Sequence, residues 1–220
     1  MKKHIIVFVF LMLIAGCGSK PIPDWTNAAF NQLENFRKNY LAGKTQIAEI
    51  HFNKAVEEIK KSGDLDILAR AYLTKCAVQT AVLEKMDDRE YLRIDAVQPV
   101  PQNRSFHKFL GGDTAHVEEK LLPVQYQGFF MAYRSDRFAD ISGEISKMED
   151  PLSKLIAAGF LVKQDKCDEG CLKIAVDTAS KNGWKKALLV YLEKSLSFYE
   201  MQKDMEKATT VRKKIELIKN

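Results

Sequence analysis

Apolar residues recur every three or four positions along most of this chain of 220 residues. The first two stripes cover residues 30–41 and 47–59, and Gly43 separates them. Such spacing places apolar side chains on one face of a helix. The same period returns in seven later segments, namely residues 65–83, 117–138, 139–148, 151–160, 172–179, 188–199 and 205–218. No convincing run of alternating β-branched residues competes, so the pattern predicts an all-α fold of about eight helices, arranged as antiparallel helical hairpins.

Local signals mark where several of these helices begin and end. Lys61–Asp64 stops one helix and supplies an aspartate that can cap the next. Asp150 and Pro151 combine a capping residue with a proline at the first helical position, where its missing N–H is not needed. Asn182 and Gly183 form a further stop signal. We therefore expect short turns at these three points.

The stretch DAVQPVPQNRSFHKFLGGD, residues 95–113, interrupts the helical pattern. It contains two prolines and two adjacent glycines, and its apolar residues show no sustained helical period. Loops of this length inside compact domains are usually functional or disordered. We therefore predict a single domain over residues 24–220 with one long irregular loop, inserted over about residues 95–116.

Four residues of this predicted loop are candidates for an interaction site, namely Phe106, His107, Phe109 and His116. A metal site would need His and carboxylate side chains that converge and are oriented by their neighbours. The spacing of His107 and His116 matches no metal-binding motif, so we assign no metal ligand. A solvated loop is the alternative interpretation of this segment.

The beginning of the chain follows a different pattern. Lys2 and Lys3 precede the unbroken apolar run Ile5–Ala15, which is too short to cross a hydrocarbon core of about 30 Å. The run ends at Gly16-Cys17, and the four residues Ile-Ala-Gly-Cys resemble the bacterial lipobox. Proteins with a lipobox are cleaved just before the cysteine, whose sulfur carries diacylglycerol.

This resemblance implies that the protein has a lipid anchor and a defined cellular location. Residues 1–16 would be the signal peptide, Cys17 would carry the diacylglycerol and acyl chains such as palmitate, and residues 17–23 would form a lipidated tether. No other cofactor is expected. Gly18-Ser19 follow the cysteine without an adjacent Asp, which resembles lipoproteins sorted to the outer membrane. We expect the mature chain on the periplasmic face of that membrane, with the inner membrane as the alternative.

Composition and charge narrow the partners further. The chain is 46% hydrophobic and 29% charged, as is typical of an ordinary globular domain. Its formal net charge is only +5, and Lys2 and Lys3 would leave with the signal peptide. A mildly basic protein in the periplasm meets no nucleic acid. The expected partners are the membrane, through the lipid, and envelope proteins that the sequence does not identify.

Three cysteines follow Cys17. Cys76 lies on an apolar helical stripe and is expected in the core. Cys167 and Cys171 could form a disulfide in the periplasm, but an i,i+4 pair inside a regular helix has poor geometry for one. A turn, which Gly170 would permit, is needed for the bridge. Free or differently paired thiols are the alternative.

The segment AGKTQIAEIHFNKAVEEIKKSGD resembles the second helix of a tetratricopeptide repeat (TPR), with Gly43, Ala48, Phe52 and Ala55 at the repeat's spacing. This resemblance is most specific over residues 27–73 and implies stacked helical hairpins with an open binding face. Near the C-terminus the same frame fits less well, with Lys203 replacing a glycine and Arg212 an aromatic residue. An irregular helical bundle is the alternative. The stretches MEDPLSKLIAAGFLVKQ and IAVDTASKNGWKKALLVYLEKSLSFYE are similar to a group of proteobacterial lipoproteins with no assigned activity.

The sequence contains no catalytic signature. It has no GxSxG motif, and Gly111-Gly112-Asp113 lacks the context of a phosphate-binding loop. We therefore expect a non-enzymatic protein–protein interaction scaffold of the cell envelope. The alternatives are a cell-wall or lipid-active enzyme that uses an acidic residue or the predicted loop, and a carrier of a small hydrophobic ligand. The basic residues of the last helix could meet an acidic partner or anionic head groups, or form a solvated face.

Overall fold

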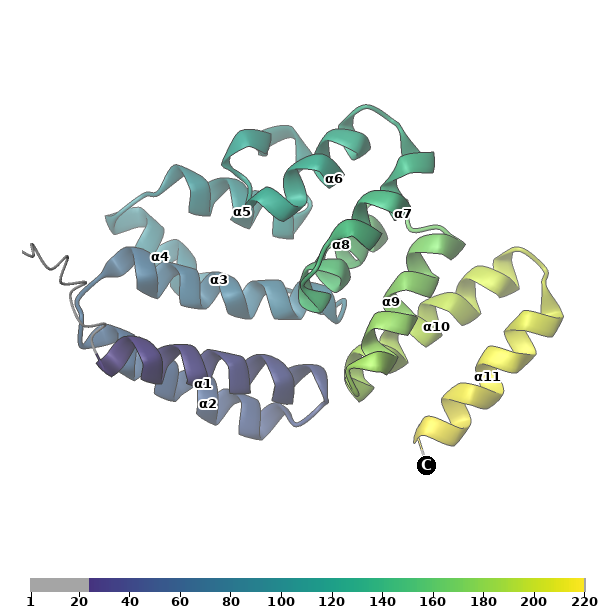
Figure 1. The fold of residues 1–220 in the computed structure, drawn as a ribbon, viewed down its shortest axis with the longest axis horizontal. Coiled ribbons are helices and arrows are strands. Elements are labelled where there is room, and N and C mark those ends of the chain that lie inside the picture. The colour runs from purple at the N-terminus through teal and green to yellow at the C-terminus, as the bar shows by residue number, and fades with distance from the viewer. Residues whose placement is uncertain (1–23, 220) are drawn as a thin grey trace, which may run out of the picture.

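The computed structural model describes residues 24–219, and its regular elements are all helices (Figure 1). For this part of the chain, the prediction of an all-α fold of antiparallel helical pairs is confirmed. The predicted signal peptide, Cys17 and the tether lie outside the described residues. The helices are α1 (Asp24–Leu41), α2 (Thr45–Lys60), α3 (Leu65–Ala81), α4 (Arg89–Val97), α5 (Pro101–Gly111), the 3₁₀ helices η1 (Thr114–His116) and η2 (Glu119–Leu121), α6 (Val124–Arg134), α7 (Phe138–Lys147), α8 (Pro151–Lys163), α9 (Glu169–Lys181), α10 (Lys185–Met201) and α11 (Met205–Lys219). None of these helices is long and apolar enough to cross a membrane.

The local signals for helix ends act as predicted. The Asp64 carboxylate accepts hydrogen bonds from the first backbone amides of α3, at 2.9 and 3.1 Å. The Asp150 carboxylate accepts the backbone amide of Ser153 at 2.9 Å, and Pro151 occupies the first position of α8. Gly183 follows α9 with a φ of +66°, a conformation that favours glycine. These helix ends are therefore set by residues within a few positions of each end.

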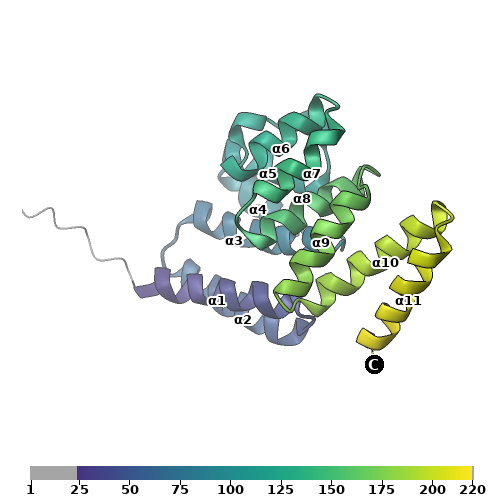
Figure 2. The same cartoon turned by 45° about the vertical axis from the view of Figure 1, so that its right-hand side comes forward.

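The helices pair along an array with one interruption. At one end α1 packs against α2, and at the other α10 packs against both α9 and α11 (Figure 1). Between these ends α3 packs against α8, while α4–α7 form an insertion on one side of that pair (Figure 2). One hydrophobic core runs from Phe36 on α1 to Tyr191 on α10. The insertion is therefore part of the same packed unit as the array.

A glycine allows α3 and α8 to pair. A Cβ atom at Gly159 of α8 would lie 2.3 Å from the backbone carbonyl oxygen of Thr80 on α3. Real Cβ atoms essentially never approach another atom so closely, and the neighbour is backbone rather than a flexible side chain. Since protein interiors are close-packed, any larger residue at this position would push the two helices apart.

The end of α8 also fastens the insertion. Lys163 donates a hydrogen bond from Nζ to the carbonyl oxygen of Leu110 at 2.7 Å, and Gln164 donates one from Nε2 to that of Gly112 at 3.0 Å. These carbonyls lie at the C-terminal end of α5, where helix carbonyls have no partner in their own helix and carry partial negative charge. Burial lowers the pKa of Lys163. Two side chains at the end of α8 therefore provide hydrogen-bond donors for carbonyl groups at the end of α5, which lies about fifty residues earlier in the chain.

Aromatic rings fill the space between the insertion and the α3–α8 pair. Phe109 of α5 stacks on Phe160 of α8 with ring centroids 4.7 Å apart, and both side chains are fully buried. Phe129 and Phe130 of α6 contact Phe160 edge-on, at 5.7 and 6.0 Å. Cys76 is fully buried in the same core, as expected from its stripe, and burial raises its pKa to about 12. Its thiol is therefore a packing group rather than a reactive one.

The prediction of a long irregular loop over about residues 95–116 is wrong. Residues 89–97 and 101–111 form the helices α4 and α5, which the pattern of apolar residues did not indicate. Pro101 occupies the first position of α5, and Gly112 ends that helix with a φ of +82°. A proline at the start and a glycine past the end are ordinary helix signals. Here they stand so close together that the short helix between them reads as a break in the pattern.

Substitution of Gly159 by Ala tests the backbone contact between α3 and α8. The added methyl group collides with the Thr80 carbonyl oxygen, and overpacking of this kind lowers the free energy of unfolding by about 1–3 kcal/mol. Gly143→Ala is the matched control, because Gly143 is also helical and a Cβ there meets nothing within 4 Å. Urea denaturation of both variants measures the difference. Equal stability of the two would contradict the assigned role of Gly159.

Buried tyrosines predict a loss of stability in alkali. Burial raises the pKa of Tyr126 and of Tyr191, whose hydroxyl donates a hydrogen bond to the Leu155 carbonyl oxygen at 2.9 Å. An unfolded tyrosine ionises at about pH 10. The stabilisation is therefore fully present below that pH and falls as the pH rises above it. Urea denaturation along a pH series, with tyrosinate absorbance recorded in parallel, measures this loss, and Tyr191→Phe should make it shallower. Ionisation of Tyr191 without unfolding would refute the prediction.

Candidate functional site

The two phenylalanines proposed for the interaction loop face the interior. Phe109 is fully buried in the aromatic core. Phe106 is half-buried and stacks on the ring of Tyr126, with centroids 5.6 Å apart. Both lie on α5, so they belong to a packed helix instead of a mobile loop. Their apolar character is used by the fold itself.

The two histidines of the same segment point to different neighbours. His107 of α5 lies 2.7 Å from Asp88 and stacks on the Tyr91 ring. His116 of η1 is exposed and lies 2.8 Å from Asp113. The structure therefore does not bring the four proposed residues onto one surface. Within residues 24–219, no group of three or more His, Cys, Asp and Glu side chains is arranged to hold a metal ion.

Cys167 and Cys171 form a disulfide with Cα atoms 5.6 Å apart. The bridge does not depend on a turn at Gly170, which lies inside α9. Cys167 precedes the helix, Asp168 is its capping residue, and only Cys171 lies within the first turn. Asp168 accepts the backbone amide of Cys171 at 2.7 Å. The helix start therefore provides the change of direction that a bridge between i and i+4 requires.

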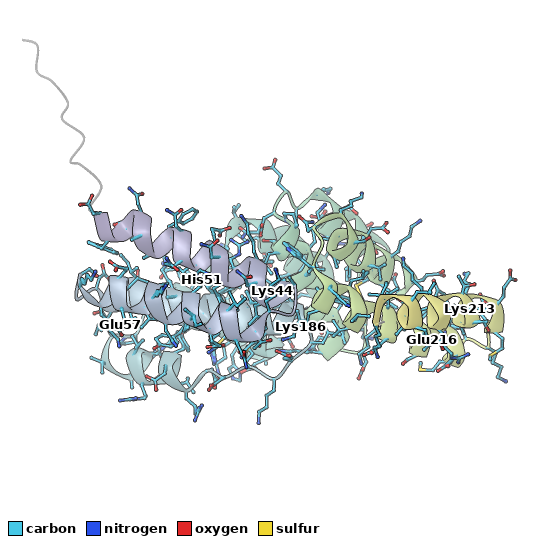
Figure 3. The ribbon with its side chains drawn as sticks, turned by 90° about the horizontal axis from the view of Figure 1, so that it is seen from below. Lys44, His51, Glu57, Lys186, Lys213 and Glu216 are labelled. Carbon is cyan, nitrogen blue, oxygen red and sulfur yellow. A yellow bond between two sulfur atoms is a disulfide. The ribbon has the colours of Figure 1, made fainter. Side chains whose placement is uncertain are left out.

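The best candidate site is a groove between the α1–α2 turn, α10 and the end of α11, which we call the α2–α10 groove. Its volume is about 470 Å³. It is lined by Ala42, Gly43, Thr45, Lys185, Lys186, Leu189, Val190, Glu193 and Lys219. Figure 3 shows Lys44, just before α2, close to Lys186 on α10. Sites that receive ligands have volumes of roughly 300–1,000 Å³, so the groove can hold several side chains of a partner.

Gly43 shapes one wall of this groove. Its φ of +91° lies in the left-handed region, so the turn between α1 and α2 is tight. A Cβ atom at Gly43 would lie 3.6 Å from Cβ of Lys186, which shows that the turn rests directly on the first turn of α10. Gly43, which the sequence marks as a helix end, is therefore also the point where the α1–α2 pair contacts α10.

A charged cluster holds the same wall in place. Lys186 places Nζ 2.8 Å from a carboxylate oxygen of Glu84 and 3.9 Å from the centroid of the Tyr40 ring. Tyr40 donates a hydrogen bond to the other oxygen of Glu84. Burial and the neighbouring Glu84 raise the pKa of Tyr40, so its hydroxyl remains a donor. The cluster connects α1, the segment after α3 and α10.

The combination of a lysine, a carboxylate and an aromatic ring recurs at two other helix contacts. Cation–π contacts and partly exposed ion pairs each contribute up to about 1 kcal/mol. The two further clusters are Lys75 with Glu49 and the Phe52 ring, and Lys207 with Glu169 and the Tyr199 ring. They connect α2 with α3 and α9–α10 with α11, so each cluster lies where separate helices meet.

Two lysines at the groove have no acidic partner: Lys185, which lines it, and Lys44, which lies between the lining residues Gly43 and Thr45. Lys186 and Lys219 are paired with Glu84 and Glu193, each at 2.8 Å. Lys44 is exposed before α2, and Lys185 is exposed at the start of α10. Across the described part of the chain, neither of these two makes an ion pair. The groove therefore carries positive charge that the fold does not neutralise.

The helix ends add to this charge. The N-termini of α2 and α10 both lie at the groove, and neither has an acidic residue in its first turn or a side-chain cap. Helix N-termini carry partial positive charge, so acidic residues are favoured there and lysines are not. Sequence reasoning missed this signal, which is visible as lysines at two helix starts, in Gly43-Lys44-Thr45 and in Gly183-Trp184-Lys185.

Removal of the Lys186 charge tests the cluster. Lys186→Met keeps an apolar stem but loses the ion pair with Glu84 and the contact with Tyr40, so the free energy of unfolding should fall by about 1 kcal/mol. Lys185→Met removes the same charge from an exposed neighbour and should change stability by less than about 0.5 kcal/mol. Thermal and urea denaturation compare the two variants. Equal effects would show that the cluster does not hold the wall.

No protein-family model matches the chain, and neither a curated protein nor a solved structure is similar to it. The resemblances to a lipoprotein signal and to TPR repeats therefore rest on the residues that carry them.

Proposed function

We propose that this chain is a non-enzymatic protein–protein interaction scaffold of the bacterial cell envelope, anchored by lipid on Cys17. The observation that carries the proposal is the α2–α10 groove, a hollow with unneutralised charge at the junction of the first helical pair and the last helices. Arrays of helical pairs bury one surface in stacking and leave another open to partners. Such a groove suits binding, since it presents charge and partly buried apolar side chains.

The first helical pair supports the TPR-like part of the proposal. Ala48, Phe52 and Ala55, which carry the resemblance, are all buried. Phe52 contacts the ring of Phe36 on α1 with centroids 5.1 Å apart, so an aromatic side chain fills the space between paired helices. The later helices α9, α10 and α11 also pack successively. The α4–α7 insertion makes the array divergent, because it separates α3 from α8.

The anchor part of the proposal rests on the lipobox-like residues that end at Cys17. The short tether of residues 17–23 would hold α1 close to the membrane surface. Two or three acyl chains on one residue anchor a protein stably, whereas a single myristoyl chain binds only marginally. A scaffold held in this way would meet partners within or beside the membrane.

The two alternatives have less support. The enzyme alternative relied on an irregular loop over an acidic pocket, and residues 101–111 are a packed helix instead. For the carrier alternative, hollows of about 540 and 390 Å³ are lined mainly by polar and charged residues. A hollow lined in part by the apolar residues Val162, Leu172, Phe198 and Met201 has a volume of about 220 Å³. That volume is below the roughly 300–1,000 Å³ of typical ligand sites. We therefore keep the scaffold as the proposed function.

The proposal predicts that the wild-type chain, crosslinked in bacterial membranes and purified, recovers the same envelope proteins in repeated experiments. Cys17→Ala should remain an uncleaved precursor without lipid, because the acceptor sulfur is lost, and should recover fewer of them. Labelling with a tagged fatty acid and analysis of the crosslinked material measure both effects. Cys76→Ala is the control, since it removes a cysteine that lies outside the signal.

Either part of the proposal can fail separately. Normal maturation of the Cys17→Ala variant would refute the lipid anchor. Failure to recover any reproducible partner from the wild-type chain would refute the scaffold function, whatever the state of the anchor.

A further inference from the structure

We propose that the α2–α10 groove binds an acidic segment of a partner protein, with its carboxylates at Lys44 and Lys185 and an apolar side chain against Leu189 and Val190. This inference rests on the proposed scaffold function and names the class of partner. It goes beyond that function because it assigns the contact to particular residues and to one kind of chemistry.

The shape of the groove favours a protein segment. Leu189 and Val190 are partly buried and lie between the α1–α2 turn and the end of α11, so they form a recessed apolar floor. Apolar surface gains free energy when a side chain covers it. A flat bilayer surface cannot reach a recessed floor, and a small inorganic anion has no apolar part to cover it. An amphipathic peptide segment has both an apolar and a charged side.

The charges specify an acidic partner. Every charged residue that lines the groove is a lysine except Glu193, and Glu193 is paired with Lys219. The one other nearby acid identified at this wall, Glu84, is paired with Lys186. An incoming carboxylate would therefore meet the unpaired Lys44 and Lys185 without facing an unpaired acid among the groove's lining residues. Complementary charge of this kind steers association and fixes register.

The helix ends strengthen this preference. No side chain caps the backbone amides at the starts of α2 and α10, although the Lys185 amide already donates to the Gly183 carbonyl oxygen at 3.1 Å. Such amides donate hydrogen bonds to carboxylates and add partial positive charge. They supplement the two lysines and would not make a site without the recessed floor.

The wall is rigid enough to recognise a partner. Lys186 is held by Glu84 and the Tyr40 ring, and Gly43 rests against its Cβ atom. Lys44 directly follows Gly43 at the start of α2, and Lys185 directly precedes Lys186 at the start of α10. Binding therefore needs little reordering of the backbone, which reduces the entropy lost on association.

Three synthetic peptides of equal length test the proposal with the full chain in detergent. One alternates Glu and Leu, the second has Gln in place of every Glu, and the third has Ser in place of every Leu. Fluorescence anisotropy should show binding of the Glu–Leu peptide, with affinity at least about tenfold weaker for the other two. Salt should weaken the binding of the first peptide, since its carboxylates are screened.

The variant Lys44→Glu/Lys185→Glu should weaken binding of the Glu–Leu peptide by about tenfold or more. Both side chains are exposed and unpaired, so the fold should be retained. Lys120→Glu/Lys173→Glu is the matched control, because it makes the same charge change at two exposed lysines on η2 and α9, which contribute no residue to the groove's lining. Equal weakening in the two double variants, or none in the groove variant, would overturn the proposal.

Micelles that contain phosphatidylglycerol test the competing idea of a lipid surface. They should displace the Glu–Leu peptide no better than micelles of phosphatidylcholine. Displacement that depends on Lys44 and Lys185 would assign these lysines to anionic lipid and overturn the proposal. If crosslinking recovers partners regardless of these two lysines, the scaffold function stands and the assigned groove is wrong. If no partner is recovered at all, the scaffold function itself fails.

Discussion

The close approach of the α3 and α8 backbones at Thr80 and Gly159 is the constraint on which the rest of the structure depends. These two helices are separated along the chain by the whole α4–α7 insertion, so their contact closes a long loop. Closing such a loop costs conformational entropy, which the packing must offset. The contact places Phe160 among the rings of α5 and α6 and brings Lys163 to the end of α5. The insertion is thereby fixed to the array from one side.

The ends of the array are joined by a different kind of interaction. At three helix contacts, a lysine whose ammonium group lies over an aromatic ring also pairs with a carboxylate, as Lys186 does with Tyr40 and Glu84. Each cluster contributes little to stability because it is partly exposed. Its effect is to orient the helices that it connects. The α2–α10 groove is a consequence, since its wall is the turn at Gly43 resting on α10.

Lys44 and Lys185 go against a local rule that α3, α8 and α9 follow. Asp64, Asp150 and Asp168 cap their helices with carboxylates, as the helix dipole favours, whereas α2 and α10 begin with lysines and no cap. Sequences usually agree with their local structure except at functional sites. The described chain offers no carboxylate that pairs with either lysine, and the proposed acidic partner would supply one.

Much of the fold was predictable from the sequence because its causes are local. Apolar spacing, the capping aspartates and the position of Cys76 in the core follow from residues within one or two turns of a helix. The prediction failed over residues 95–116, where Pro101 and Gly112 delimit a short helix whose apolar face is completed only by other helices. The groove was not predicted, because its lining comes from segments distant along the chain.

The sequence by itself determined that this chain forms helices, where most of them begin and end, and which faces are apolar. Only the tertiary structure decided that α3 pairs with α8, that the Cys167–Cys171 bridge spans the start of a helix, and that two lysine-bearing helix starts share one groove. The reason is that helix formation depends on neighbours in sequence. Helix pairing depends instead on where two backbones can approach each other, and for α3 and α8 that position is Gly159.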